Sequence, residues 1–294
     1  MDDLNKLTIL QKIAKVWQIQ LNLEYEYRKN QNTRLSFKDI GAFCELLATY
    51  YNSGFIGSGT GGMGLDLVNY KTGKTVEVKS CCTIQNAKCN KCGTKFNDLF
   101  NDYCPKCKSN DFKKINDSRF GIDAKEFLRQ FNNGKFENFT MCYISLIDQN
   151  KQQNTIVVKL EWFKVQFTDK EIKNIQLEYF KNQVNFGRKA HCNLLPKSYD
   201  FYKLCPTKID DKNITINYED LNIPPEVINC DFEKNLKVPI DLIPKENREF
   251  FMTLKSYFNN YADAKDFTKN LSYKKKSLGK KRGNTRRTVD QILK

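Results

Sequence analysis

Two pairs of closely spaced cysteines constrain this chain more than any other feature. Cys89-Asn90-Lys91-Cys92 is followed, after eleven residues, by Cys104-Pro105-Lys106-Cys107. A Cys-x-x-Cys turn directs both sulfur atoms towards one point, and two such turns complete a tetrahedral four-sulfur shell around Zn²⁺. Gly93 follows the first pair, where this turn usually requires a positive φ. The spacing therefore predicts a structural zinc site on Cys89, Cys92, Cys104 and Cys107.

The other seven cysteines show no such spacing, and the chain opens without a basic segment followed by an apolar one. We therefore expect an unexported, cytoplasmic protein with reduced thiols, most of them small buried side chains. A redox-active pair is the alternative for each Cys-x-x-Cys, although such a pair normally occurs singly. For some of these cysteines the alternative to burial is a partial second metal site, formed by His191, Cys192 and Cys205. No run of about 18 apolar residues predicts a membrane span.

Positive charge is concentrated at one end of the chain. The 294 residues contain 49 Lys and Arg against 34 Asp and Glu, a formal charge of +15. Residues 264–294 hold eleven of the basic side chains and two acids, hence +9. Clustered charge of this kind suits a polyanion whose counterions it displaces, whereas a solvated tail without a partner is the alternative. The candidate contacts are Lys274, Lys275, Lys276, Lys280, Lys281, Arg282, Arg286 and Arg287.

A glycine-rich segment at residues 57–64 formally contains the dinucleotide-binding pattern Gly-x-Gly-x-x-Gly. That pattern must follow a strand and open a helix. Residues 65–70 alternate in polarity and carry no helix cap, so they read as a strand. No P-loop pattern occurs elsewhere. Nucleotide binding is therefore rejected.

Residues 65–70 and 75–80 are both strand-like, and Gly73 between them can take the positive φ of a tight turn. Symmetric pairing about Thr72 and Gly73 predicts three cross-strand pairs: Tyr70 with Thr75, Val68 with Glu77, and Asp66 with Lys79. Because directly opposed residues share a face, Asp66, Glu77 and Lys79 project together.

Two neighbouring carboxylates repel each other unless a cation neutralises them, and hard oxygen ligands suit Mg²⁺. An adjacent lysine can orient or deprotonate a water. The alternative is an ordinary solvent-facing hairpin. The stripe of Ile40, Phe43, Cys44, Leu47 and Ala48 predicts a helix within residues 37–51. Glu45 lies off this stripe and is either an additional acid at the site or a surface residue.

Asp66 with Glu77-Val78-Lys79 resembles the motif of the PD-(D/E)xK nucleases, and the helix with Glu45 resembles the acidic helix that precedes it in many members. The resemblance implies that Asp66, Glu77 and the Val78 carbonyl bind Mg²⁺ and that Lys79 serves the attacking water. Leu65 stands where the motif has proline. The segment 117–124 is similar to type II restriction endonucleases that carry a four-cysteine zinc module, and its Ser118 and Arg119 are candidate DNA contacts.

The rest of the chain predicts an α/β fold with a mixed central sheet between helices. We expect a helix at 124–131, strands at 139–147 and 155–163, and a helix at 169–181 capped by Thr168. Regularity is lost from about residue 183, where Arg188 and Lys189 are candidate DNA contacts, and a helix is expected again at 246–261. The expected domains are a nuclease core (1–165) interrupted by the zinc module (83–116), a helical or irregular DNA-recognition region (166–262) and a basic tail (263–294).

These features together predict a Mg²⁺-dependent type II restriction endonuclease with structural Zn²⁺. It would cleave double-stranded DNA and, at a palindromic site, act as a homodimer. Two alternatives remain: another PD-(D/E)xK nuclease, such as a resolvase or repair nickase, and a non-catalytic zinc-containing nucleic-acid-binding protein. Metal-dependent cleavage separates both nucleases from the binding protein.

Overall fold

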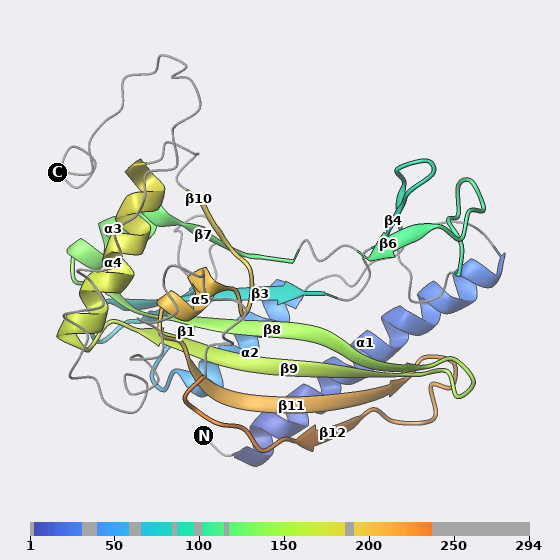
Figure 1. The fold of residues 1–294 in the computed structure, drawn as a ribbon. Helices are drawn as coiled ribbons and strands as arrows, with labels where there is room; N and C mark the ends of the chain where they lie inside the picture. The colour runs from blue at the N-terminus through green and yellow to red at the C-terminus, as the bar shows by residue number, and fades with distance from the viewer. Residues whose placement is uncertain are drawn as a thin grey trace.

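The computed structural model describes residues 3–30, 40–58, 66–83, 87–96, 102–114, 118–185 and 191–236. The helices are α1 (Asp3–Asn30), α2 (Ile40–Tyr51), α3 (Ala124–Asn132), α4 (Lys170–Asn185) and α5 (Tyr199–Lys203). The strands are β1 (Ile56–Gly57), β2 (Leu67–Asn69), β3 (Lys74–Cys82), β4 (Ala87–Cys89), β5 (Lys95–Phe96), β6 (Phe112–Lys114), β7 (Phe120–Asp123), β8 (Phe136–Asn150), β9 (Thr155–Gln166), β10 (His191–Leu194), β11 (Thr207–Asn217) and β12 (Glu226–Asn229) (Figure 1).

A mixed seven-stranded sheet organises the molecule, in the order β1-β2-β3-β8-β9-β11-β12. β3 and β8 run parallel, and the other neighbouring pairs of this sheet are antiparallel. The connection from β3 to β8 is long because a parallel pair needs a crossover, and it contains β4–β6, β7 and α3. The prediction of an α/β fold with a mixed sheet and helices is confirmed.

Helices cover both faces of this sheet (Figure 1). On one face, α1 and α2 pack through residues spaced three or four apart, such as Ala14, Trp17 and Leu21 of α1. On the other face, α3, α4 and α5 enclose a phenylalanine-rich core together with β7 and β10. Trp162 and Phe163 of β9 are both about 1% exposed or less, although they point to opposite faces. The central strands are therefore buried on both sides.

Charged side chains are buried where β11 meets the helices. The Tyr51 hydroxyl donates to Asp210 Oδ2 at 2.5 Å, Lys6 Nζ lies 2.5 Å from the same oxygen, and Lys212 pairs with Oδ1. Burial alone would raise the pKa of Asp210, but these hydrogen bonds outweigh it and lower the pKa to about 2. Asp210 thus links β11 to both α1 and α2.

Several expectations about secondary structure need correction. The prediction of irregular structure from about residue 183 is wrong for residues 207–217, because these residues form β11, which pairs with β9 along its length. Asp169 rather than Thr168 caps α4, since its Oδ1 accepts the hydrogen bond from the Ile172 amide at 3.0 Å. The helix expected at 246–261 and the basic tail lie outside the described residues. None of the described helices is long and apolar enough to span a membrane.

Candidate metal and nuclease site

The hairpin of β2 and β3 forms as predicted, but its register differs by two residues. Val68 pairs with Thr75, and Asn69 pairs with Lys74. The Asn69 side chain accepts hydrogen bonds from the amides of Lys71 and Thr72, so the turn begins one residue earlier than expected. Val68 is therefore not opposite Glu77, and Asp66 is not opposite Lys79. A shift of two residues preserves the faces, so the acidic and basic side chains still project together.

Asp66, Glu77 and Lys79 meet at the start of this hairpin. Lys79 Nζ lies 2.5 Å from Glu77 Oε1 and 3.8 Å from Asp66 Oδ2. The Val78 amide donates to the same Asp66 oxygen at 2.7 Å, which fixes this carboxylate against β3. Burial alone would lower the pKa of Lys79, but Glu77 and Asp66 raise it above its ordinary value. Lys79 is therefore an ammonium at neutral pH.

Glu77 is the most strongly perturbed acid of this group. Burial raises its pKa to about 7, Asp66 adds to the increase, and Lys79 opposes it. Its Oε2 atom is buried and accepts no hydrogen bond from the part of the chain that is described. A cavity of about 20 Å³ adjoins Glu77, with room for about one water-sized species. An oxygen ligand in this state is suited to a cation, because a cation would stabilise its ionised form.

α3 adds two acids to the same cavity, which the sequence analysis did not place there. Asp123 caps α3 by accepting from the amides of Lys125 and Glu126 at 2.9 and 3.0 Å. Glu126 binds Arg129 and Gln130, and hydrogen bonds from Arg129 contribute most to lowering its pKa. The Asp-x-x-Glu spacing at a helix start was the available signal, because it places both carboxylates on the first turn.

The structure brings Glu45 to this group. Burial is the main cause that raises its pKa, and Asp66 raises it further while Lys79 lowers it. Glu45 lies on α2, whose buried residues Cys44, Leu47 and Ala48 pack against the sheet. Four of the predicted side chains therefore share one electrostatic environment: Glu45, Asp66, Glu77 and Lys79. Val78 itself is buried, 5% exposed, and its contribution here is the amide that holds Asp66.

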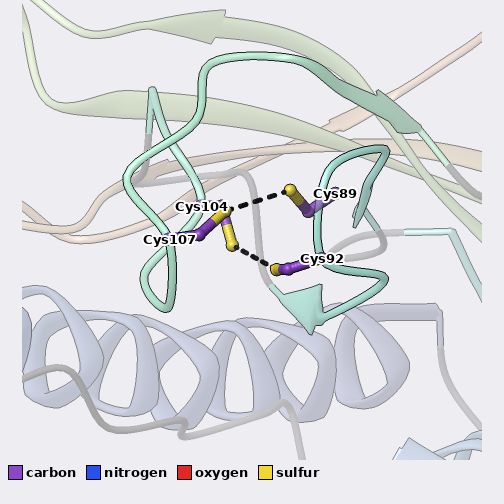
Figure 2. Close-up of side chains that lie close together, drawn as sticks. All are labelled: Cys89, Cys92, Cys104 and Cys107. Atoms are coloured by element: carbon purple, nitrogen blue, oxygen red, sulfur yellow. Dashed lines mark hydrogen bonds between the residues drawn. The ribbon is translucent and has the colours of Figure 1, made fainter.

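The four spaced cysteines converge beside a separate three-stranded sheet formed by β5, β4 and β6, with only Cys89 on one of its strands. Figure 2 shows their sulfur atoms facing one another from two loops. All four sulfurs lie within 4.8 Å of one another, and the Cys89–Cys107 and Cys92–Cys104 pairs are each 3.5 Å apart. A regular tetrahedron with Zn–S bonds of about 2.3 Å has edges of about 3.8 Å. The donor set and its size therefore fit Zn²⁺.

The two cysteine turns have the same backbone geometry. Gly93 has φ of +72° and donates its amide to Cys89 O at 3.0 Å, while Lys108 has φ of +59° and donates to Cys104 O at 2.9 Å. The positive φ predicted at Gly93 is confirmed, and the equivalent one at Lys108 was not predicted. Hydrogen bonds from Thr94 lower the pKa of Cys92. A backbone hydrogen bond from Ser109 would lower the pKa of Cys107, but burial and the neighbouring cysteines raise it.

Other predicted residues are not brought together in this way. His191 is exposed and Cys192 is buried, because neighbours in β10 point to opposite faces, and the two side chains form no ligand group with Cys205. The second metal site is therefore wrong. Ser118 donates its hydroxyl to the Cys82 carbonyl, and Arg119 is exposed. Arg188 and Lys189 lie outside the described residues, as do Lys274, Lys275, Lys276, Lys280, Lys281, Arg282, Arg286 and Arg287.

Comparison with known proteins adds one match. The family model of the MamI restriction endonuclease matches residues 30–256, which include α2, the hairpin, the cysteine sheet and all strands through β12. No curated protein and no solved structure matches this chain. A restriction endonuclease is a hydrolase that acts on DNA, in agreement with the acidic site and the basic chain. Because the match spans more than half of the sequence, the chain belongs to the MamI restriction endonuclease family.

Proposed function

We propose that this protein is a Mg²⁺-dependent type II restriction endonuclease that hydrolyses phosphodiester bonds of double-stranded DNA within a specific sequence. The single observation that carries the proposal is the convergence of Asp66, Glu77 and Lys79, with Lys79 Nζ 2.5 Å from Glu77 and 3.8 Å from Asp66. These residues carry the roles that the PD-(D/E)xK motif implies. The order of α2, the antiparallel hairpin, α3 and a parallel β8 supports such a core.

Asp66 and Glu77 are the residues that would hold Mg²⁺, with the Val78 carbonyl as a further ligand and Glu45 within the same group. Glu77 supports this role because its Oε2 is buried and unpaired within the described chain. Bound Mg²⁺ supplies Lewis-acid stabilisation of the scissile phosphate and lowers the pKa of a bound water. The four cysteines would hold Zn²⁺, which closes the β4–β6 module and takes no part in the reaction.

Lys79 would orient the attacking water and offset charge on the phosphate. Because neighbouring carboxylates raise its pKa, the ammonium form dominates, and this favours orientation over proton removal. The water oxygen forms a bond to phosphorus while the bond to the 3′ oxygen breaks. The water's proton passes to solvent and the 3′ oxygen takes up a proton, which leaves 5′-phosphate and 3′-hydroxyl ends.

A set of variants tests these roles. Asp66→Ala and Lys79→Ala should reduce cleavage at least 100-fold while leaving DNA binding in place. Lys74→Gln is the matched control, because Lys74 lies on the same strand and pairs with exposed Glu137. Retained cleavage in Asp66→Ala would remove the catalytic assignment. A palindromic target would require two such sites, so we further propose a homodimer, which light scattering with and without DNA measures.

A further inference from the structure

We infer that two copies of this chain associate through the outer face of α1, with the two helices antiparallel. The inference rests on the proposed function for the need for two copies, and it gives the proposed homodimer a contact surface. Three apolar side chains on α1 are exposed: Val16 by 39%, Ile19 by 41% and Leu23 by 56%. Among the described side chains, no other helix exposes more than one large apolar residue. A single exposed apolar residue is ordinary, whereas a cluster marks an interaction surface.

α1 carries two apolar stripes at helical spacing. The inner stripe, which includes Leu10, Trp17 and Leu21, packs in the core of the sheet. The outer stripe begins at Lys12 and ends at Glu26, with alternating steps of four and three residues, and both end residues are exposed. These steps are those of the a and d positions of a coiled coil, which form one narrow seam for a second helix. The outer stripe is defined here as Lys12, Val16, Ile19, Leu23 and Glu26.

The charges at the two ends of the outer stripe favour an antiparallel pair of identical helices. Lys12 and Glu26 each lie seven residues from Ile19, which is about 10.5 Å along the helix axis. A two-fold axis at Ile19 therefore places Lys12 of each copy opposite Glu26 of the other. A parallel pair would instead bring like charges together at both ends. Glu26 also has an interaction within its own chain, and a carboxylate has acceptor positions for more than one partner. The outer stripe is thus complementary to itself.

A contact through the outer stripe leaves the proposed catalytic group uncovered by the second copy. Val76 and Val78 of β3 belong to the core that α1 and α2 form with the sheet. Glu77 lines a cavity with residues of α3 on the opposite face, because side chains of a strand alternate. α1 contacts β11 and β12, which lie at the edge of the sheet opposite to β1 (Figure 1). Both copies therefore keep their acidic sites accessible.

Sedimentation equilibrium of the full-length protein without DNA, from about 1 to 100 µM, measures this association. We expect a reversible dimer with a micromolar Kd, because one helix pair about 21 Å long buries less than a standard interface. Ile19→Glu should raise the Kd about 30-fold or more, since it removes an apolar side chain from each copy and brings two carboxylates together at the axis. Leu23→Glu should also raise the Kd, and it serves as the second variant if Ile19→Glu does not fold.

Ile56→Glu is the matched control, because it makes the same substitution at a residue that is 55% exposed. Ile56 lies on β1, at the edge of the sheet opposite to β11 and β12. Its Kd should stay within about threefold of the wild-type value. Glutamate is at least as good a helix former as isoleucine, so Ile19→Glu should keep α1 intact. Circular dichroism and zinc content establish that each variant is folded.

Charge reversal tests the antiparallel arrangement separately from the apolar contact. Lys12→Glu or Glu26→Lys would bring like charges together at both ends of the seam, and each should raise the Kd about fivefold or more at low salt. The double variant restores opposite charges and should return the Kd to within about twofold of the wild-type value. High salt should reduce the effect of each single variant, because it screens exposed charges.

A wild-type protein that stays monomeric throughout this range would overturn the inference, as would an equal Kd for Ile19→Glu and the wild type or an equal loss in Ile56→Glu. A double variant as weak as the single charge reversals would overturn the antiparallel arrangement. Cleavage of plasmid DNA with Mg²⁺ is scored separately. If DNA is cut by a monomeric protein, the contact surface is refuted and the nuclease stands. If the dimer responds as expected and no DNA is cut, the contact surface stands and the nuclease proposal fails.

Discussion

Phe127 of α3 links the stability of this protein to the chemistry of its acidic site. It is 3% exposed and packs against five other phenylalanine rings, with centroid distances from 4.3 Å for Phe180 to 5.7 Å for Phe131. It also lines the cavity that adjoins Glu77. Truncation of a buried phenylalanine costs about 3–5 kcal/mol, and the density of aromatic contacts places Phe127→Ala at about 4–5 kcal/mol.

Urea unfolding followed by circular dichroism measures this loss as a change in the free energy of unfolding. Phe131→Ala is the control, because Phe131 belongs to the same aromatic cluster, is only partly buried and does not line the cavity. It should cost about half as much or less. A loss below about 2 kcal/mol for Phe127→Ala would refute the packing argument.

The same variant should change the pH dependence of cleavage. Burial is the largest cause that raises the pKa of Glu77 from 4.5 to about 7, and Phe127→Ala would admit water to the cavity. The pKa of Glu77 should therefore fall. If cleavage requires the Glu77 carboxylate, the rate rises with pH through this pKa, and the acidic limb of the profile moves to lower pH. Single-turnover cleavage rates at low temperature measure this shift. An acidic limb at the same pH in Phe127→Ala and the wild type would contradict the predicted fall in the pKa of Glu77.

Three further perturbations have defined outcomes. Cys89→Ser should release zinc and unfold the β4–β6 module, as metal analysis and proteolysis of the module would show; full zinc content would count against the site. Glu45→Gln should raise the Mg²⁺ concentration needed for half-maximal cleavage without loss of stability, whereas an unchanged Mg²⁺ requirement would make Glu45 a surface residue. Asp210→Asn should cost about 1–2 kcal/mol at pH 7, because the pKa of Asp210 is lowered from 3.8 to about 2. The wild type should lose this contribution to the free energy of unfolding as pH falls from about 4 to 2. If Asp210→Asn lost as much stability over the same range, the result would argue against the ion pairs of Asp210.

Local patterns predicted the parts of this protein that short-range chemistry determines. The cysteine spacing predicted the four-sulfur cluster, and alternation with Gly73 predicted the hairpin. The predicted hairpin register was wrong because it depended on one side chain, Asn69, which accepts hydrogen bonds from two amides and starts the turn one residue earlier. The predicted face of each side chain was still correct, because side chains alternate with a period of two and the register differed by two residues.

Long-range packing determined the parts that were missed. β11 contains Lys208, Asp210, Asp211 and Lys212, which read as a polar segment, yet Lys208 reaches Glu161 at 2.6 Å and Asp211 at 2.8 Å within the sheet. The hydrophobic pattern of one segment does not show which charged side chains of a neighbouring strand will pair with it. α1 carried an apolar stripe at helical spacing, Leu10, Ala14, Trp17 and Leu21, that the sequence analysis did not use. Glu126 reaches the site because α3 packs against β8, the strand beside β3, and this contact joins residues far apart in the sequence.

Cleavage of plasmid DNA in the presence and absence of Mg²⁺ tests the proposed activity most directly. Purified wild-type protein and Lys79→Ala would be incubated with the same plasmid, and the ends of any fragments would be sequenced. The proposed site predicts discrete fragments with 5′-phosphates that need both Mg²⁺ and Lys79. Plasmid that stays intact in every lane, or fragments formed equally by Lys79→Ala, would contradict it.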